Sequence, residues 1–207
     1  MTTYDIITKI IANVNRDDLT RAMVLQYLNN RKFTIQNYDN FSFMEQTAEQ
    51  AAVALQQSYS IPTDYKDELQ MWLLDGTQKT IITKWGGSEA EKNFTQTDRS
   101  GKPTNYWLWQ EAYFLYPLPD KSYSMILKYY RYIPDFTDVA SEENELCKRY
   151  PDLLINGGTS DSYHFFKEWE KVGEWEGKYK LDFQILIRRE GRRPRTNTDS
   201  RMKVRVR

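Results

Sequence analysis

The sequence predicts an α+β protein: a helical module, built from N- and C-terminal helices, with an inserted antiparallel β-rich module and an extended basic C-terminal arm. Apolar residues recur at helical spacing near both ends, alternating patterns typical of strands fill the middle, and the last residues are rich in arginine. We place the N-terminal helices at 1–46, the β-rich module at 47–137, the C-terminal helices at 138–190 and the arm at 191–207.

The N-terminal segment predicts two helices. The first is amphipathic, with one apolar side formed by Ile6, Ile7, Ile10, Ile11 and Val14. A second helix should follow directly, because Asn15 can cap it and its charges suit a helix dipole, with aspartates first and Arg31 and Lys32 last. Residues 29–40 are polar and predict turns.

Residues 47–57 fit either a helix or a strand. Their alanines favour a helix by propensity. The alternation of apolar residues, however, continues to Ile61, and Pro62 pushes that residue into an extended conformation. We therefore favour a strand from about Glu49.

Further strands are predicted after Pro62. Residues 69–74 and 80–85 form a hairpin around the turn signal Asp75-Gly76, and a short helix covers 88–94. Three more strands follow, at 106–110, 113–116 and 122–132. The last carries apolar or aromatic side chains on both faces, so both should be at least partly covered.

The C-terminal part of the body returns to helices. An acidic loop at 135–145 ends the β pattern, and Pro151 opens a helix at its first position. Gly173 should end or bend that helix, and residues 174–189 predict another, although residues 178–188 also alternate as a strand does. The pair Gly157-Gly158 inside a helix indicates close approach of another backbone, within the fold or across a subunit contact.

Charge is unevenly distributed although the formal net charge is zero. Residues 188–207 contain nine of the 29 Lys and Arg but two of the 29 Asp and Glu, a net charge of +7 that leaves −7 for residues 1–187. Such a basic arm seeks an acidic surface, which is nucleic acid, another protein or a neighbouring copy of this body.

The sequence contains few of the residues and motifs that catalysis or metal binding would need. One cysteine, Cys147, and one histidine, His164, exclude a disulfide framework and a zinc or haem cluster, and no nucleophile or phosphate-binding motif occurs. Catalysis by a pair of carboxylates would need two acids that meet in one cleft, and no such pair is indicated. Six acids are instead clustered in predicted loops: Asp64, Asp67, Glu68, Glu142, Glu143 and Glu145. We predict no enzyme, no catalytic residue, no metal and no cofactor. No membrane span or secretory signal is apparent.

The order of several short motifs resembles the head-to-tail adaptor proteins of tailed bacteriophages. These motifs are YSIPTD at 59–64, LDG at 74–76, PTNYW at 103–107, LYPLPD at 115–120, MILKYYR at 125–131, and YPDLLI at 150–155 with Gly157. The resemblance runs from about residue 41 to 170. After Gly158 the chain is more polar than the alanine-rich helix expected there, and the arm beyond Gly191 lies outside the resemblance.

The resemblance implies a structural virion protein at the head-to-tail junction, synthesised in the host cytoplasm. Its subunits would form a ring, taken as dodecameric, beneath the portal protein and offer a docking surface to a downstream tail or nozzle protein. DNA would pass through the lumen without sequence-specific binding. This connector is the leading functional hypothesis.

Two groups of residues are the candidate interaction sites. In the β-rich module, the excess of aromatic residues is typical of ordinary core strands or of an interface, and we assign a subunit or tail interface to Tyr106, Trp107, Trp109 and Tyr113. The arm ends in alternating charged and apolar residues, which can add as a strand to a partner's sheet. We assign these arm residues to the portal: Arg192, Arg193, Arg195, Arg201, Met202, Lys203, Val204, Arg205, Val206 and Arg207.

Two alternatives remain open from the sequence. A nucleic-acid-binding protein would use the arm on phosphates and the module's aromatics as stacking platforms. A carbohydrate-binding or carbohydrate-hydrolysing module rests only on aromatic and acidic residues.

Overall fold

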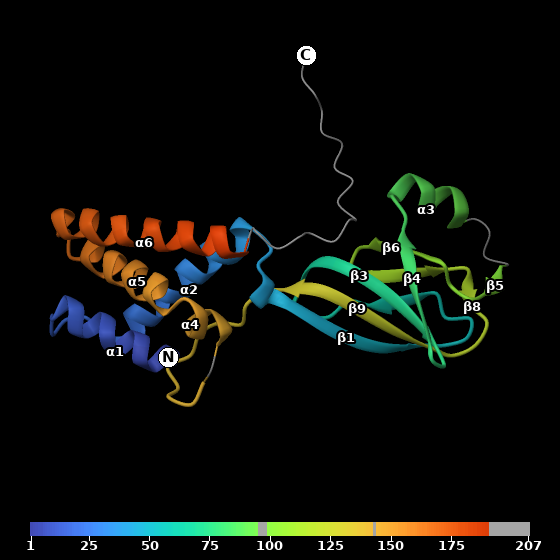
Figure 1. Ribbon diagram of the computed structural model, residues 1–207, viewed down its shortest axis with the longest axis horizontal. Helices are drawn as coiled ribbons and strands as arrows, with labels where there is room; N and C mark the ends of the chain where they lie inside the picture. The colour runs from blue at the N-terminus through green and yellow to red at the C-terminus, as the bar shows by residue number, and fades with distance from the viewer. Residues whose placement is uncertain (95–98, 143, 191–207) are drawn as a thin grey trace, which may run out of the picture. The chain divides into compact units, whose positions relative to one another are not determined.

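The computed structural model describes residues 1–94, 99–142 and 144–190, and the chain forms two compact units (Figure 1). The helical unit combines Met1–Phe43 with the described residues from Asp135 to Glu190, and the β unit is Met44–Pro134. The described residues contain six α-helices and a mixed main sheet, so the α+β class is confirmed.

The helical unit begins with α1 (Thr3–Val14) and α2 (Arg21–Tyr38). Thr2 caps α1 in a reciprocal pair with Asp5, and the isoleucine stripe is buried as predicted, except for the partly exposed Ile11. The predicted bounds of the second helix are wrong, because Thr20 rather than Asn15 is its N-cap. The predicted turns at 29–40 are also wrong, since α2 continues to Tyr38.

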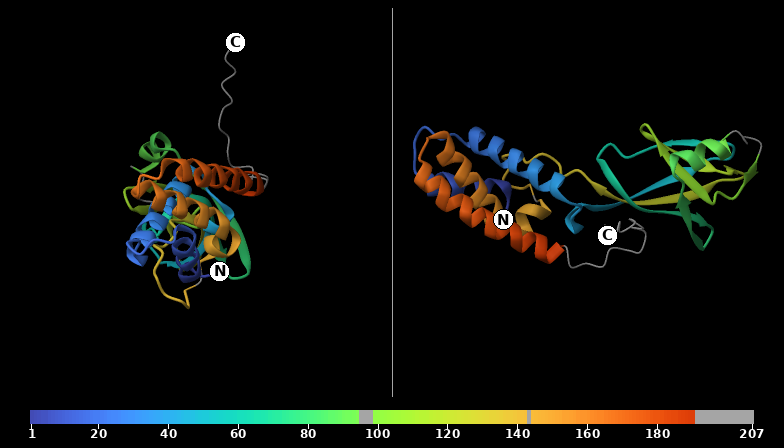
Figure 2. Two further views of the ribbon diagram at one scale, coloured as in Figure 1. Left: turned by 90° about the vertical axis from the view of Figure 1, so that its left-hand side faces the viewer. Right: turned by 90° about the horizontal axis from the view of Figure 1, so that it is seen from above.

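Helix α5 (Pro151–Phe165) is the centre of the helical unit and packs against α1, α2 and α6 (Trp169–Glu190), with the short α4 (Glu145–Arg149) before it (Figure 2). Pro151 occupies its first turn, as predicted. The chain turns at Lys167, which has a positive φ of 60°, so the break between α5 and α6 falls there. Gly173 lies inside α6 and neither ends nor begins it. Residues 178–188 are helical.

The paired glycines of α5 make room for side chains rather than for another backbone. A Cβ at Gly158 would stand 2.6 Å from Ile10 Cδ1 and 3.2 Å from Leu28 Cδ2. A Cβ at Gly157 would stand 3.0 Å from the Tyr179 ring. These contacts all lie within the helical unit, and they allow α1, α2 and α6 to approach α5 closely.

The β unit contains a seven-stranded sheet with the order β1-β9-β3-β4-β6-β7-β2. Its strands are β1 (Glu45–Ala52), β2 (Ser58–Ser60), β3 (Tyr65–Asp75), β4 (Gln78–Lys84), β6 (Asn105–Trp109), β7 (Ala112–Tyr116) and β9 (Tyr123–Arg131). Strands β5 (Ser100–Gly101) and β8 (Leu118–Pro119) form a separate parallel pair. The hairpin of β3 and β4 and the strand at 47–52 are confirmed.

The β-rich module is mixed, not antiparallel throughout. Strands β4 and β6 run parallel: after the long connection through α3 (Gly87–Phe94), β6 begins beside the last two residues of β4, with Thr83 opposite Asn105 and Lys84 opposite Tyr106. The predicted continuous alternation from 49 to 61 is also interrupted. Leu55 has a positive φ of 63° and turns the chain between β1 and β2.

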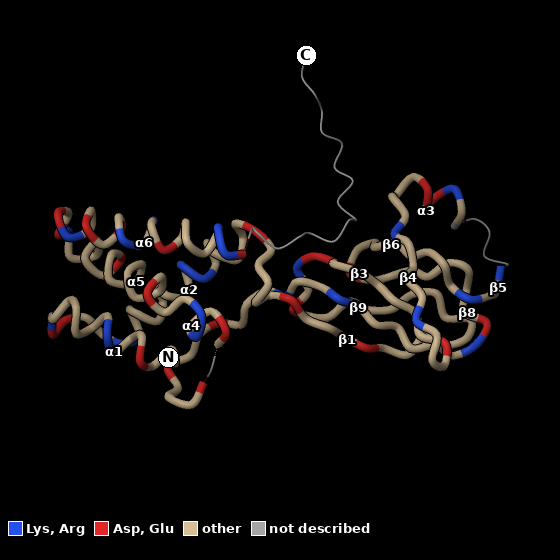
Figure 3. Tube along the Cα trace, in the orientation of Figure 1, with Lys and Arg blue, Asp and Glu red and all other residues tan. Residues whose placement is uncertain are grey.

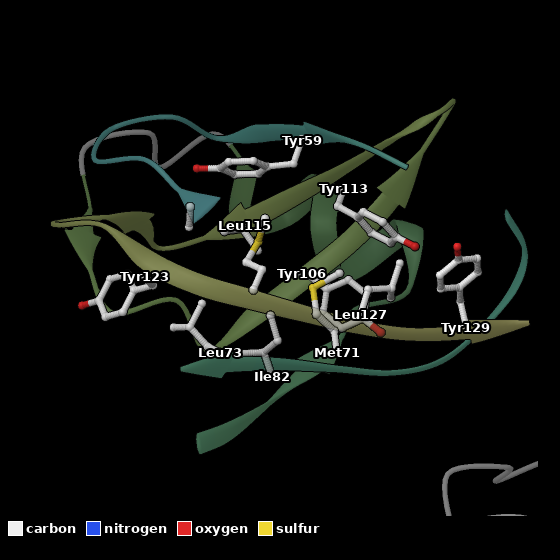
Figure 4. Packing of buried hydrophobic residues seen from close by; sticks show 12 residues of the cluster. Tyr59, Met71, Leu73, Ile82, Tyr106, Tyr113, Leu115, Tyr123, Leu127 and Tyr129 are labelled. Atoms are coloured by element: carbon white, nitrogen blue, oxygen red, sulfur yellow. The ribbon is translucent and has the colours of Figure 1, made fainter. Parts of the chain in front are cut away.

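The core of the β unit is a cluster of buried side chains from all seven strands (Figure 4). On β9 the alternate residues Tyr123, Met125, Leu127 and Tyr129 are buried, while those between them are partly covered. Both faces of this strand are therefore covered to some degree, as predicted.

Candidate interaction surfaces

The four aromatic residues predicted as an interface lie in the β6–β7 hairpin but have different environments. Tyr106 and Tyr113 belong to the core cluster, and Trp107 is buried with its ring stacked 5.2 Å from that of Phe114. Trp109 is 61% exposed. The interface role stays a prediction, and only Trp109 among the four offers substantial side-chain surface in this structure.

Trp109 ends β6 at the tip of the hairpin. The next residue, Gln110, has a positive φ of 52°, which lets the chain reverse before β7. An exposed tryptophan on a tight turn combines a large apolar surface with little conformational freedom, which is typical of residues that anchor an interface.

One buried tyrosine of this hairpin contacts a carboxylate on β3. The Tyr106 hydroxyl donates to Glu68 Oε2 at 3.3 Å, and Lys84 forms an ion pair with the same carboxylate. Burial, followed by the charge of Glu68, raises the pKa of Tyr106. Asp67 and Glu68 thus lie on β3 and not in a loop, and Glu68 is part of a paired internal contact.

The two outer strands of the sheet, β1 and β2, line one groove of about 300 Å³. Its floor is apolar and includes Met71, Met125 and Leu127. Because β1 and β2 stand at opposite ends of the strand order, the sheet must curl until both edges face this groove. No sequence pattern predicted the groove itself, although the lack of Lys and Pro in residues 45–52 is a local signal for an open strand edge.

A second hollow, of about 390 Å³, lies in the helical unit and is lined by Arg31, Asp161 and His164, among others. Arg31 binds Asp161 through two hydrogen bonds of 2.7 and 2.8 Å and also pairs with Glu176 at 2.8 Å. Burial alone would lower the pKa of Arg31, but the two carboxylates outweigh burial and raise it. This network joins α2, α5 and α6 and gives the polar residues of the hollow a structural role.

The remaining residues of interest are dispersed. His164 is exposed, with its ring edge-on to Trp169 at 5.1 Å. The Glu142 carboxylate accepts a hydrogen bond from the Thr137 backbone, and Glu145 pairs with Arg149. Glu143 and all the arm residues assigned to the portal, from Arg192 to Arg207, lie outside the described residues.

Two further kinds of site are absent from the part of the chain that the structure describes. No group of three or more His, Cys, Asp or Glu residues there is arranged to hold a metal ion. No helix among the same residues has both the length and the apolar character needed to cross a bilayer.

A family model described as SU10 adaptor protein matches residues 1–205. The match includes both segments of the helical unit and the whole β unit, so it covers the complete architecture described above. It places the chain among the structural adaptor proteins of bacteriophages. Specifically, the chain belongs to the SU10 adaptor protein family, a phage head-to-tail adaptor family, which confirms the resemblance seen in the sequence motifs. No curated protein matches it.

Proposed function

We propose that this protein forms a ring beneath the portal, joins the capsid vertex to the tail and lets DNA pass through its lumen. The observation that carries this proposal is the family match over residues 1–205. A ring of twelve copies is the expected assembly, located in the virion at the head-to-tail junction.

Two surfaces are proposed to make the contacts of the ring. The exposed indole of Trp109 supports a role for the β6–β7 hairpin in a subunit or tail contact. The arm is the proposed portal contact, because its net positive charge suits an acidic protein surface. Of its arginines, Arg192 and Arg193 are nearest to the end of α6.

The test is reconstitution of the full-length protein with the portal protein of the same phage, followed by electron microscopy. We expect a ring of twelve subunits on one end of the portal. A chain that ends at Glu190 should retain the circular dichroism of the folded body and lose portal attachment. A protein that forms no ring on the portal, or that is absent from purified particles, would contradict the proposal.

We propose that the protein acts without catalysis. Replacement of His164, Glu142, Glu143 or Glu145 by alanine should leave ring assembly on the portal unchanged. The proposal fails if the folded protein shows a turnover that any one of these substitutions abolishes.

Nucleic-acid binding is a second candidate, favoured by the net charge of +7 in residues 188–207. The buried side chains of Tyr106, Trp107 and Tyr113 do not offer the stacking platform that this alternative needs. The arm alone would then bind phosphates, and affinity for duplex DNA should fall steeply with salt. A higher affinity of the protein for DNA than for the portal, measured at physiological salt, would favour this candidate.

A further inference from the structure

Strand β1 presents an unprotected edge. All eight of its residues pair with β9 in one continuous register, without a bulge, and no strand among the described residues pairs with its other side. Its sequence, EQTAEQAA, contains no Lys and no Pro, which commonly block an exposed edge, and its only charged residues are Glu45 and Glu49. Such an edge is a template for an added strand.

The groove beside this edge limits the size of what can occupy it. The groove has a volume of about 300 Å³. That volume accepts a few side chains of an extended segment and excludes a folded domain. The apolar floor at Met71, Met125 and Leu127 selects apolar side chains on the inward face of that segment.

The two faces of β1 differ in chemistry. Ala48 and Ala52 face the core, which places Glu45 and Glu49 on the opposite face, where both are exposed. Figure 3 shows acidic residues and no basic residue on this strand. A matching strand therefore needs apolar residues facing the groove and basic residues facing outward, with the basic residues four positions apart like the two glutamates.

Residues 201–207 of this chain have that pattern. Met202, Val204 and Val206 alternate with the basic residues Arg201, Lys203, Arg205 and Arg207. Arg201 and Arg205 are four positions apart, as are Lys203 and Arg207. The segment is connected to α6 by residues 191–200, which span at most about 35 Å when extended.

We propose that residues 201–207 of one copy add as an edge strand to β1 of a second copy, with the three apolar side chains in the groove. The proposal rests on the proposed ring and refines the role of the arm. Arg192, Arg193 and Arg195 stay available to the portal, while the final segment connects neighbouring subunits.

The test uses cysteine cross-linking between two differently tagged full-length variants co-assembled on the portal. One variant carries Thr47→Cys on β1 and the other carries Arg205→Cys. The native Cys147 is fully buried and does not compete. The matched control replaces Thr47→Cys with Thr80→Cys, an exposed position on the interior strand β4. We expect a cross-link between tags for Thr47→Cys and none for Thr80→Cys.

Charge and shape are then varied separately. Glu45→Lys with Glu49→Lys should remove most of the cross-link, and Lys203→Glu with Arg207→Glu in the partner copy should restore it, because these two residues stand opposite the glutamates when position 205 faces Thr47. Val204→Asp with Val206→Asp leaves the sequence of the body intact and should also abolish the cross-link.

The possible results distinguish this inference from the proposed function. Rings on the portal with no more cross-linking at Thr47→Cys than at Thr80→Cys would overturn the inference and leave the adaptor role standing. A chain that carries both Thr47→Cys and Arg205→Cys and cross-links only within itself would overturn the inference as well. If no ring forms on the portal, both the proposed function and this inference fail.

Discussion

Replacing Gly158 with alanine tests whether close packing around α5 holds the helical unit together. The new methyl group would stand 2.6 Å from Ile10 Cδ1, whereas carbon atoms in good contact are about 3.5–4.0 Å apart. Ile10 and Leu28 are both fully buried, so neither can move into free space. Crowding of this kind costs about 1–3 kcal/mol.

The same substitution at Gly177 provides the matched control. Gly177 lies inside α6, and a Cβ there meets nothing within 4 Å. Alanine in place of glycine stabilises a helix by about 1 kcal/mol at either position. Gly177→Ala should therefore raise the free energy of unfolding by about 1 kcal/mol. Gly158→Ala should unfold about 1–3 kcal/mol more easily than Gly177→Ala, because crowding is the only difference.

Urea unfolding of the full-length chain, followed by the helical circular dichroism signal, measures this difference. Gly157→Ala should fall between the two, since its Cβ would contact the edge of the Tyr179 ring at 3.0 Å. A Gly158→Ala protein as stable as Gly177→Ala would refute the argument that these glycines exist for close approach.

Three further predictions follow from individual side chains. Burial raises the pKa of the Cys147 thiol to about 11, so a thiol reagent at neutral pH should label Cys147 only after unfolding, and rapid labelling of the native protein would contradict this. Hydrogen bonds from Arg21 lower the pKa of Asp138, so the pair stabilises the fold above the unfolded pKa of 3.8 and loses its effect as pH falls through the folded value. Asp138→Asn should therefore lower stability by up to about 1 kcal/mol at neutral pH and match the wild type in acid, whereas a constant difference across this pH range would be inconsistent with the pairing. Trp109→Ala should change the free energy of unfolding by less than about 0.5 kcal/mol yet weaken ring assembly more than tenfold, unlike the exposed control Ile81→Ala, and equal assembly by the two variants would exclude an anchoring role.

Local sequence patterns correctly predicted those helices and turns whose position depends on a few neighbouring residues. The isoleucine stripe of α1, the Pro151 start of α5 and the Asp75-Gly76 turn are all defined within a few residues. The second half of α2 was missed because its stability comes from distant partners. Lys32 forms an ion pair with Asp135, and Asn29 exchanges hydrogen bonds with the Phe136 backbone.

The aromatic interface of the β6–β7 hairpin was predicted less completely than the helices, because burial depends on distant parts of the chain. An alternating aromatic strand shows which residues share a face, but not which of two faces is more deeply covered. Tyr106 and Trp107 point to opposite faces of β6, yet both are buried. The parallel pairing of β4 with β6, and the closure of β1 and β2 around one groove, depend on the path of the whole chain, which no local pattern encodes.

The insertion of the β unit between Phe43 and Asp135 imposes an order on biosynthesis. On the ribosome, α1 and α2 emerge first but cannot complete their packing, because α5 is made only after the entire β unit. At about 5–20 residues per second, roughly 7–30 s pass between the synthesis of α1 and that of α5. The β unit, whose strands are contiguous in the chain, can fold during that interval, so a nascent chain whose β unit has left the ribosome before α5 does should hold a folded sheet and an α1–α2 pair that lacks α5.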